Sequence, residues 1–284
     1  MNLIQKWEDA GLSNDFVFSK VMIDPKICQE VIQRVLPELK IDHIKLPNSQ
    51  EEINFAPDAK GVRFDVFTRD TKNNCYDIEM QVADEKDLLK RAQYYQAMTS
   101  LDSYEKGKNY QEANNSYVIF FCCFDPLGLG LQQYTIHRHV DESPEHIADD
   151  GTTTIFLNIP SLRKDVNQPL QKFLDVIANR KVDGDDRFIV QLKKRIAFVK
   201  HNKKWRAEYM RLSLYEMDRR HGLKVARQEG IQEGIEEGKE EAILQVTSLF
   251  IKQQLLKENI IANLKEAYDL TDEEAEQYYK RCLK

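Results

Sequence analysis

The 284-residue sequence has no apolar run long enough to cross a bilayer. The longest, residues 117–124, has eight residues, whereas about 18 are needed. Five cysteines without a Cys-x-x-Cys pair argue against a disulfide framework and a zinc knuckle. The N-terminus lacks an apolar core of signal-peptide length. We therefore expect a cytoplasmic protein that is not embedded in a membrane.

Proline and glycine are also scarce, with 8 and 11 residues, whereas the chain contains 13 Phe and 12 Tyr and is 42% apolar. This composition excludes a fibrous or low-complexity protein and argues against disorder in the main part of the chain. A chain of this length can bury a substantial core. We expect one large domain with an appendage, or two modest domains.

Charge is unevenly distributed along the chain, although the formal net charge is only −6. Residues 187–227 contain 13 Lys and Arg against three acidic residues, and the segments on both sides are acidic. Such a block can bind a polyanion such as DNA. Alternatively, it is a solvated helix neutralised by an acidic neighbour. The candidate DNA contacts are Lys193, Lys194, Arg195, Lys200, Lys203, Lys204 and Arg206.

Residues 61–68 and 75–82 alternate apolar and polar side chains, and the turn-rich sequence between them predicts a β-hairpin. A pair of helices starting at Asn14 or Asp15 precedes it. A helix from about Asp84 to Glu105, closed by Gly107, a buried strand at 117–124 and a short strand at 154–159 follow. The elements predict an α/β fold with a mixed sheet flanked by helices. We expect a core at 1–165, a basic helical region at 166–228 and an acidic helical region at 229–284.

Glycines recur every four residues at Gly230, Gly234 and Gly238, within an acidic segment. Each glycine costs a helix about 1 kcal/mol relative to alanine. The stripe therefore suits close approach of a second helix, as in a homodimer, and the alternative is a flexible acidic hinge. Two further helices are expected after it, the second beginning with the capping box Thr271-x-x-Glu274.

The polar side chains of the hairpin predict a metal site. Asp65 on one strand and Glu79 on the next can converge, because opposing Cβ atoms of antiparallel strands lie about 4.5–5.5 Å apart. Carboxylate and carbonyl oxygens suit Mg²⁺, so the main-chain carbonyl of Met80 is a candidate third ligand. Asp77 is an alternative second carboxylate. Alternatively, these residues form the solvated face of an antiparallel sheet.

Several motifs occur in a specific order: Gly61-Val-Arg-Phe-Asp65, Tyr76-Asp-Ile-Glu79-Met-Gln81-Val and Lys90-Arg91-Ala-Gln-Tyr94-Tyr95. With these motifs, residues 14–160 resemble the Rpn family of recombination-promoting nucleases and transposases, within the PD-(D/E)XK superfamily. The resemblance implies a restriction-endonuclease-like core. It also implies an Mg²⁺-dependent DNA endonuclease of low sequence specificity, with Mn²⁺ as a second usable metal, acting in recombination, transposition or defence against foreign DNA.

The resemblance also implies roles for single residues. Asp65 and Glu79 would bind the metal, and Gln81 would occupy the position of the superfamily lysine. An amide supplies no positive charge and no general base, so deprotonation must depend more on the metal. Arg91 and Tyr94 lie three residues apart on one helix face and could support the site. Alternatively, both residues have structural roles: Arg91 forms a surface salt bridge, and Tyr95 packs against neighbouring side chains.

Three further interpretations remain open. Gln81 is compatible with an inactive nuclease-fold module that binds DNA or a protein, or with a transposition accessory that nicks DNA only inside a complex. Asp15 or Glu30 could add a carboxylate, although a helix cap or a surface acid explains each better. The histidines at 137, 139 and 146 have no carboxylate at ligand spacing and are interpreted as surface residues.

Overall fold

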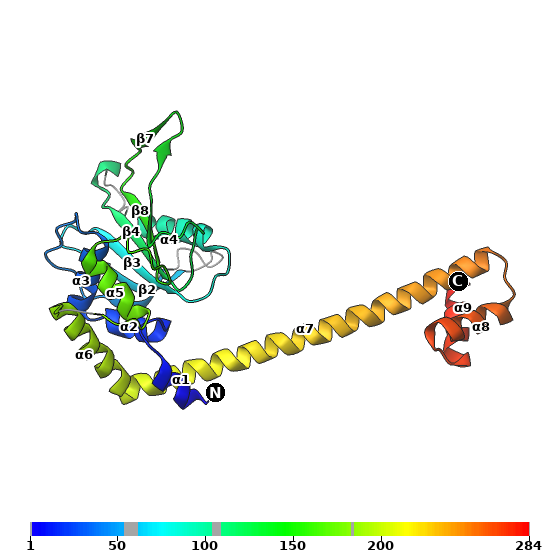
Figure 1. Ribbon diagram of the computed structural model, residues 1–284. Helices are drawn as coiled ribbons and strands as arrows, with labels where there is room; N and C mark the ends of the chain where they lie inside the picture. Colours follow the sequence, from blue (N-terminus) through cyan, green and yellow to red (C-terminus); the bar gives the residue numbers. More distant parts are fainter. Residues whose placement is uncertain (1, 54–61, 104–108, 183–184, 284) are drawn as a thin grey trace. The chain divides into compact units, whose positions relative to one another are not determined.

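The computed structural model describes residues 2–53, 62–103, 109–182 and 185–283 (Figure 1). Gly61, Glu105 and Gly107, which were assigned to the ends of predicted elements, lie outside these ranges. The chain divides into two compact units, residues 1–211 and 212–284. The helix α7 (Lys203–Lys252) begins in the first unit and ends in the second. Within the described ranges, none of the helices combines the length and the apolar composition that a membrane span requires.

The first unit is built on a six-stranded sheet with the strand order β1-β2-β3-β4-β8-β5. β4 pairs in parallel with β3 and β8, and the other neighbours are antiparallel, so the predicted mixed sheet is confirmed. β6 and β7 form a separate ribbon. The strands are β1 (Asn48–Ile53), β2 (Val62–Arg69), β3 (Cys75–Gln81), β4 (Ser116–Cys122), β5 (Gln133–Ile136), β6 (His139–Val140), β7 (Ser143–Ile147) and β8 (Thr152–Asn158).

A side-chain-stabilised turn closes the predicted hairpin of β2 and β3. Asp70 Oδ1 accepts hydrogen bonds from the backbone N–H groups of Lys72 at 2.8 Å and Asn74 at 2.9 Å. Asn73 adopts the left-handed conformation with φ 63°, which asparagine tolerates better than most residues. The turn fixes the register in which Thr68 pairs with Tyr76.

Helices cover both faces of the sheet, and the central strand β4 shows this most clearly (Figure 1). Phe120 lies 6.0 Å from the Tyr95 ring of α4, whereas Phe121 lies 5.4 Å from Phe18 of α2 and 5.5 Å from Phe173 of α5. Every residue of β4 is buried, as the continuous apolar run predicts. The helices of this unit, besides the start of α7, are α1 (Leu3–Asp9), α2 (Asp15–Met22), α3 (Pro25–Val35), α4 (Leu88–Ser103), the single 3₁₀ turn η1 (Tyr110–Glu112), α5 (Gln168–Ile177) and α6 (Arg187–His201).

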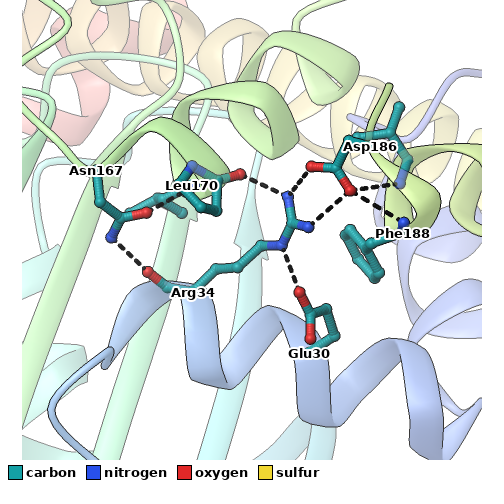
Figure 2. Close-up of polar contacts among 8 residues, drawn as sticks. Glu30, Arg34, Asn167, Leu170, Asp186 and Phe188 are labelled. Carbon is teal, nitrogen blue, oxygen red and sulfur yellow. Dashed lines mark hydrogen bonds and ion pairs between the residues drawn. The ribbon is translucent and has the colours of Figure 1, made fainter. Parts of the chain in front are cut away.

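A buried arginine joins α3, α5 and α6 (Figure 2). The Arg34 guanidinium pairs with Glu30 at 2.9 Å and with Asp186 at 3.0 Å, and donates to the carbonyl of Pro169 at 2.7 Å. Asp186 also accepts from the first N–H groups of α6, and the Asn167 side chain, which caps α5, donates to the carbonyl of Arg34 at 2.9 Å. Arg34 therefore links the N-terminal caps of two helices to a third.

The second unit packs the end of α7 against α8 (Lys257–Tyr268) and α9 (Asp272–Cys282) around Ile243, Ile260 and Leu264. The predicted capping box of Thr271 and Glu274 is present at the start of α9. Gly230, Gly234 and Gly238 lie within continuous helix, so the alternative interpretation of this segment as a flexible hinge is wrong. A Cβ atom added at any of these glycines would meet nothing within 4 Å, so the described residues of the second unit supply no close helical neighbour there.

Candidate active site

The carboxylates of Asp65 and Glu79 meet where β2 and β3 separate. The hydrogen-bonded register between these strands ends at the pair of Val66 and Ile78. Beyond it, the backbone N–H of Asp65 donates to Glu79 Oε1 at 2.8 Å, and the backbone N–H of Met80 donates to Asp65 Oδ2 at 3.0 Å. Each strand end is therefore held by a carboxylate of the other strand. The hairpin brings the two side chains together as its register predicts.

The Met80 carbonyl lies on the same side of β3 as these carboxylates. The N–H and C=O groups of one residue in an extended strand point in the same direction. The N–H of Met80 points to Asp65 on β2, whereas the carbonyl of Gln81 accepts from the N–H of Cys123, beyond β4. The Met80 carbonyl is consequently directed to the β2 side, where the predicted metal ligands lie.

The polar face of the hairpin is buried at Asp77 and Glu79 and half-buried at Asp65 and Gln81, which makes the interpretation as a solvated sheet face wrong. β3 is an interior strand covered by α4, so Asp77 is 0% and Glu79 4% exposed. Burial raises the pKa of both carboxyls well above the ordinary range, and the negative charge of Asp65 raises each further. Asp77 and Glu79 also lie close enough for each to affect the pKa of the other. A cation bound here would offset the repulsion among these acidic groups and favour their charged forms.

The raised pKa of Asp77 predicts an unusual pH dependence of stability. The buried pair of Asp77 and Glu79 keeps a proton in the folded protein that the unfolded chain releases above a pKa of about 4. The free energy of unfolding therefore falls as the pH rises from that value toward the raised pKa. Asp77→Asn should make this dependence shallower and stabilise the protein by about 1–3 kcal/mol at pH 8. Urea unfolding at pH 5 and pH 8 measures the effect.

The exposed Asp42 provides the control for that prediction. Asp42→Asn should leave the unfolding free energy unchanged at both pH values, because its carboxyl keeps contact with water. Equal stability of the Asp77→Asn variant and the parent at pH 8 would contradict the prediction.

The Gln81 amide is fixed at both ends. Its Oε1 accepts from Arg91 Nη1 at 2.8 Å, and its Nε2 donates to the carbonyl of Ala83 at 2.7 Å. Arg91 lies over the Tyr95 ring at 5.7 Å, and its Nη2 contacts the Tyr95 hydroxyl at 3.4 Å. Gln81 therefore connects the end of β3 to Arg91 of α4.

Tyr95 supplies an aromatic contact of Arg91. Its ring packs edge to face on Phe64 at 5.5 Å. Burial and the nearby charge of Glu79 raise the pKa of its hydroxyl to about 12, so the hydroxyl stays protonated. Tyr94 packs against the cluster that contains Phe64 and Met98. The spacing of three or four residues from Arg91 places both tyrosines near its face, so the sequence signal did not separate them.

The residues at this site fit a hard divalent cation. Asp65 and Glu79 provide carboxylate oxygens and Met80 a carbonyl oxygen, which is the donor chemistry that Mg²⁺ prefers. Within the described ranges, no group of three or more His, Cys, Asp or Glu side chains is arranged to hold a metal. Two carboxylates would leave coordination positions for water and a phosphate oxygen, and Mg²⁺ commonly keeps several waters.

The predicted DNA contacts fall into two groups. Lys193, Lys194, Lys203 and Lys204 are exposed, and Arg206 is half-buried. Arg195 donates to the carbonyl of Lys20 at 3.1 Å and lies 5.3 Å from the Phe198 ring. Lys200 donates to the carbonyls of Trp7, Glu8 and Ala10, the last at 2.9 Å, at the C-terminal end of α1. Arg195 and Lys200 are therefore engaged inside the protein, whereas the four lysines present free surface charge.

The remaining candidate residues make contacts with groups other than Asp65 and Glu79. Asp15 accepts from the N–H of Phe16 in the first turn of α2, and Glu30 pairs with Arg34. His139 Nδ1 lies 2.7 Å from the carbonyl of Pro144 in the exposed ribbon. Asn14, rather than Asp15, caps α2, so Asp15 is an acid in the first turn of this helix, and Glu30 is a half-exposed acid that pairs with Arg34.

Comparisons with known proteins agree with this geometry. The chain matches the family model described as PD-(D/E)XK nuclease family transposase over residues 12–226. No curated protein and no solved structure matches the chain significantly. The matched range includes the whole sheet, the carboxylate pair, Arg91 and the basic helix α6. The chain therefore belongs to the PD-(D/E)XK nuclease family transposases.

Proposed function

We propose that the protein is an Mg²⁺-dependent DNA endonuclease that hydrolyses phosphodiester bonds with low sequence specificity, and that Mn²⁺ can replace Mg²⁺. The observation that supports this most is the pair of Asp65 and Glu79 at the point where β2 and β3 separate, within a PD-(D/E)XK core. Recombination, transposition and defence against foreign DNA are processes that such an activity would serve.

In this proposal Asp65, Glu79 and the Met80 carbonyl hold the metal. When bound, it would lower the pKa of an attacking water and stabilise the charge on a phosphate oxygen. The Gln81 oxygen is already engaged with Arg91 at 2.8 Å, so Gln81 positions the guanidinium. Arg91 then supplies the positive charge that glutamine lacks, and its planar donors suit a phosphate. The exposed lysines around α6 would hold the DNA backbone, which implies marked salt dependence.

Cleavage of supercoiled plasmid tests the assignment. The parent should nick the plasmid with Mg²⁺ and not with EDTA, and Asp65→Asn should be inactive under both conditions. The asparagine keeps an oxygen for the N–H of Met80, so lost cleavage reports on the carboxylate charge rather than on the strand contact. If this variant cuts as fast as the parent, the proposed site is wrong.

A pair of substitutions tests the role of Arg91. We expect Arg91→Met to slow cleavage by about 10–100-fold, because it removes the only cation bonded to Gln81 in the described part of the chain. Adding Gln81→Lys to that variant should recover part of the rate, because it restores a cation next to the carboxylates. Rates under single-turnover conditions measure both effects.

Lys90 provides the matched control, because it precedes Arg91 on the exposed side of α4. Lys90→Met should leave the rate unchanged. If the double variant Arg91→Met/Gln81→Lys cleaves no faster than Arg91→Met alone, Arg91 does not act by supplying a positive charge at this position.

Gln81 also supports a second candidate, a nuclease-fold module that binds DNA or a protein without cutting. Calorimetric titration with Mg²⁺ and Mn²⁺ distinguishes the two candidates. If the protein is the endonuclease, metal binding should give a heat signal that is lost in Glu79→Gln. A module without a metal site should give no signal that depends on Glu79.

A further inference from the structure

The part of α7 in the second unit carries a row of exposed apolar side chains. Leu214, Met217, Ile231, Ile235 and Leu249 are between 49% and 59% exposed. They fall on one series in which the spacing alternates between three and four residues: 214, 217, 221, 224, 228, 231, 235, 238, 242, 245 and 249. This is the a and d pattern of a coiled coil, which places these positions along one side of a helix. We call this series the α7 seam.

The seam differs from the glycine stripe and from the core of the second unit. Only Gly238 is common to the seam and the stripe. Ile243 and Thr247, which pack on α8 and α9, are buried and lie outside the seam. Leu223 is also apolar and 65% exposed, but it falls outside the 3-4 series. The seam is thus a continuous half-exposed face that α8 and α9 leave open.

Charge is segregated along the same stretch. Residues 219–227 contain four basic and no acidic residues, whereas residues 229–241 contain six acidic residues and one lysine. One of these acidic residues, Glu240, forms an ion pair with Arg281 of α9. Two parallel copies in register would place like charges side by side, which opposes association. Two antiparallel copies would place the basic segment of each beside the acidic segment of the other.

We propose that the α7 seam binds the α7 seam of a second copy of this chain in antiparallel orientation. Among the registers that agree with the 3-4 spacing, we assign the one that sets Met217 of one copy against Ile235 of the other, with Ile231 against His221. Residues 219–223 of each basic segment then lie across from residues 229–233 of the other copy, which contain Glu229 and Glu233. The polar positions 221, 224 and 228 lie in the middle of the seam, where buried polar residues fix orientation and register at a cost in stability.

Light scattering of the full-length protein tests the association. We expect a mass of twice 33.3 kDa for the parent. The variant Ile231→Glu/Ile235→Glu should raise the dissociation constant by on the order of 10²-fold, because it adds negative charge to the seam. Leu223→Glu is the matched control and should remain dimeric, because Leu223 lies outside the seam. Circular dichroism should show unchanged helix in both variants.

Disulfide mapping tests the orientation. Met217→Cys and Ile235→Cys are prepared separately, mixed and oxidised, and the linked peptides are identified by mass spectrometry, which separates them from links through the native cysteines. The antiparallel pairing predicts a link between positions 217 and 235 of different copies. A monomeric parent, a dimer that survives both seam substitutions, or a link from position 235 to position 235 would overturn the proposal. None of these results depends on nuclease activity.

Discussion

Glu79→Gln is expected to abolish cleavage without destabilising the protein. Glu79 is 4% exposed, and burial together with the charges of Asp77 and Asp65 raises its pKa. A neutral amide of the same shape removes that unfavourable charge and can still accept from the N–H of Asp65. The same change removes a charged metal ligand, so we expect the cleavage rate to fall by on the order of 10²–10³-fold. Plasmid cleavage and the thermal midpoint measure the two effects.

The exposed Glu85 on the following loop supplies the control. Glu85→Gln should change neither the rate nor the midpoint. A Glu79→Gln variant that is both inactive and clearly less stable would indicate that the carboxylate has a structural rather than a catalytic role.

Arg34→Met is expected to cause the largest loss of stability. Its guanidinium is 6% exposed, pairs with Glu30 and Asp186, and lies 4.2 Å from the Phe188 ring. Methionine fills a similar volume but leaves the Asp186 carboxylate without its partner, and breaking a buried ion pair in this way costs about 3–5 kcal/mol. Urea denaturation monitored by far-UV circular dichroism measures the change.

Arg163 provides the comparison, because its side chain is 56% exposed and lies 3.4 Å from Asp165. Exposed pairs contribute about 0–1 kcal/mol, so Arg163→Met should have little effect. If the two substitutions destabilise the protein equally, the connection among α3, α5 and α6 does not depend on Arg34.

The sequence was informative wherever a local pattern was sufficient. Alternation identified β2 and β3, and the apolar run of residues 117–124 identified the doubly covered strand β4. β1, with the sequence NSQEEI, lacks the alternation of apolar and polar residues that would predict a strand. An edge strand of the sheet can tolerate such polar residues, because one of its sides has no neighbouring strand.

Properties that depend on distant contacts were harder to predict. The burial of Asp77 and Glu79 follows from α4 covering β3, which no pattern within residues 75–82 indicates. Likewise, the engagement of Lys200 with the end of α1 joins residues about 190 positions apart. Composition therefore identified the basic segment correctly without distinguishing its structural cations from its exposed ones.

The reciprocal bonds between the ends of β2 and β3 affect how variants of this site should be designed. Alanine at position 65 or 79 would leave a main-chain amide of the opposite strand without its acceptor. An alanine scan would consequently combine a defect in chemistry with a frayed strand end and would overestimate the contribution of the negative charge. Amide isosteres preserve the acceptor and remove only the charge, so Asn and Gln are the informative replacements here.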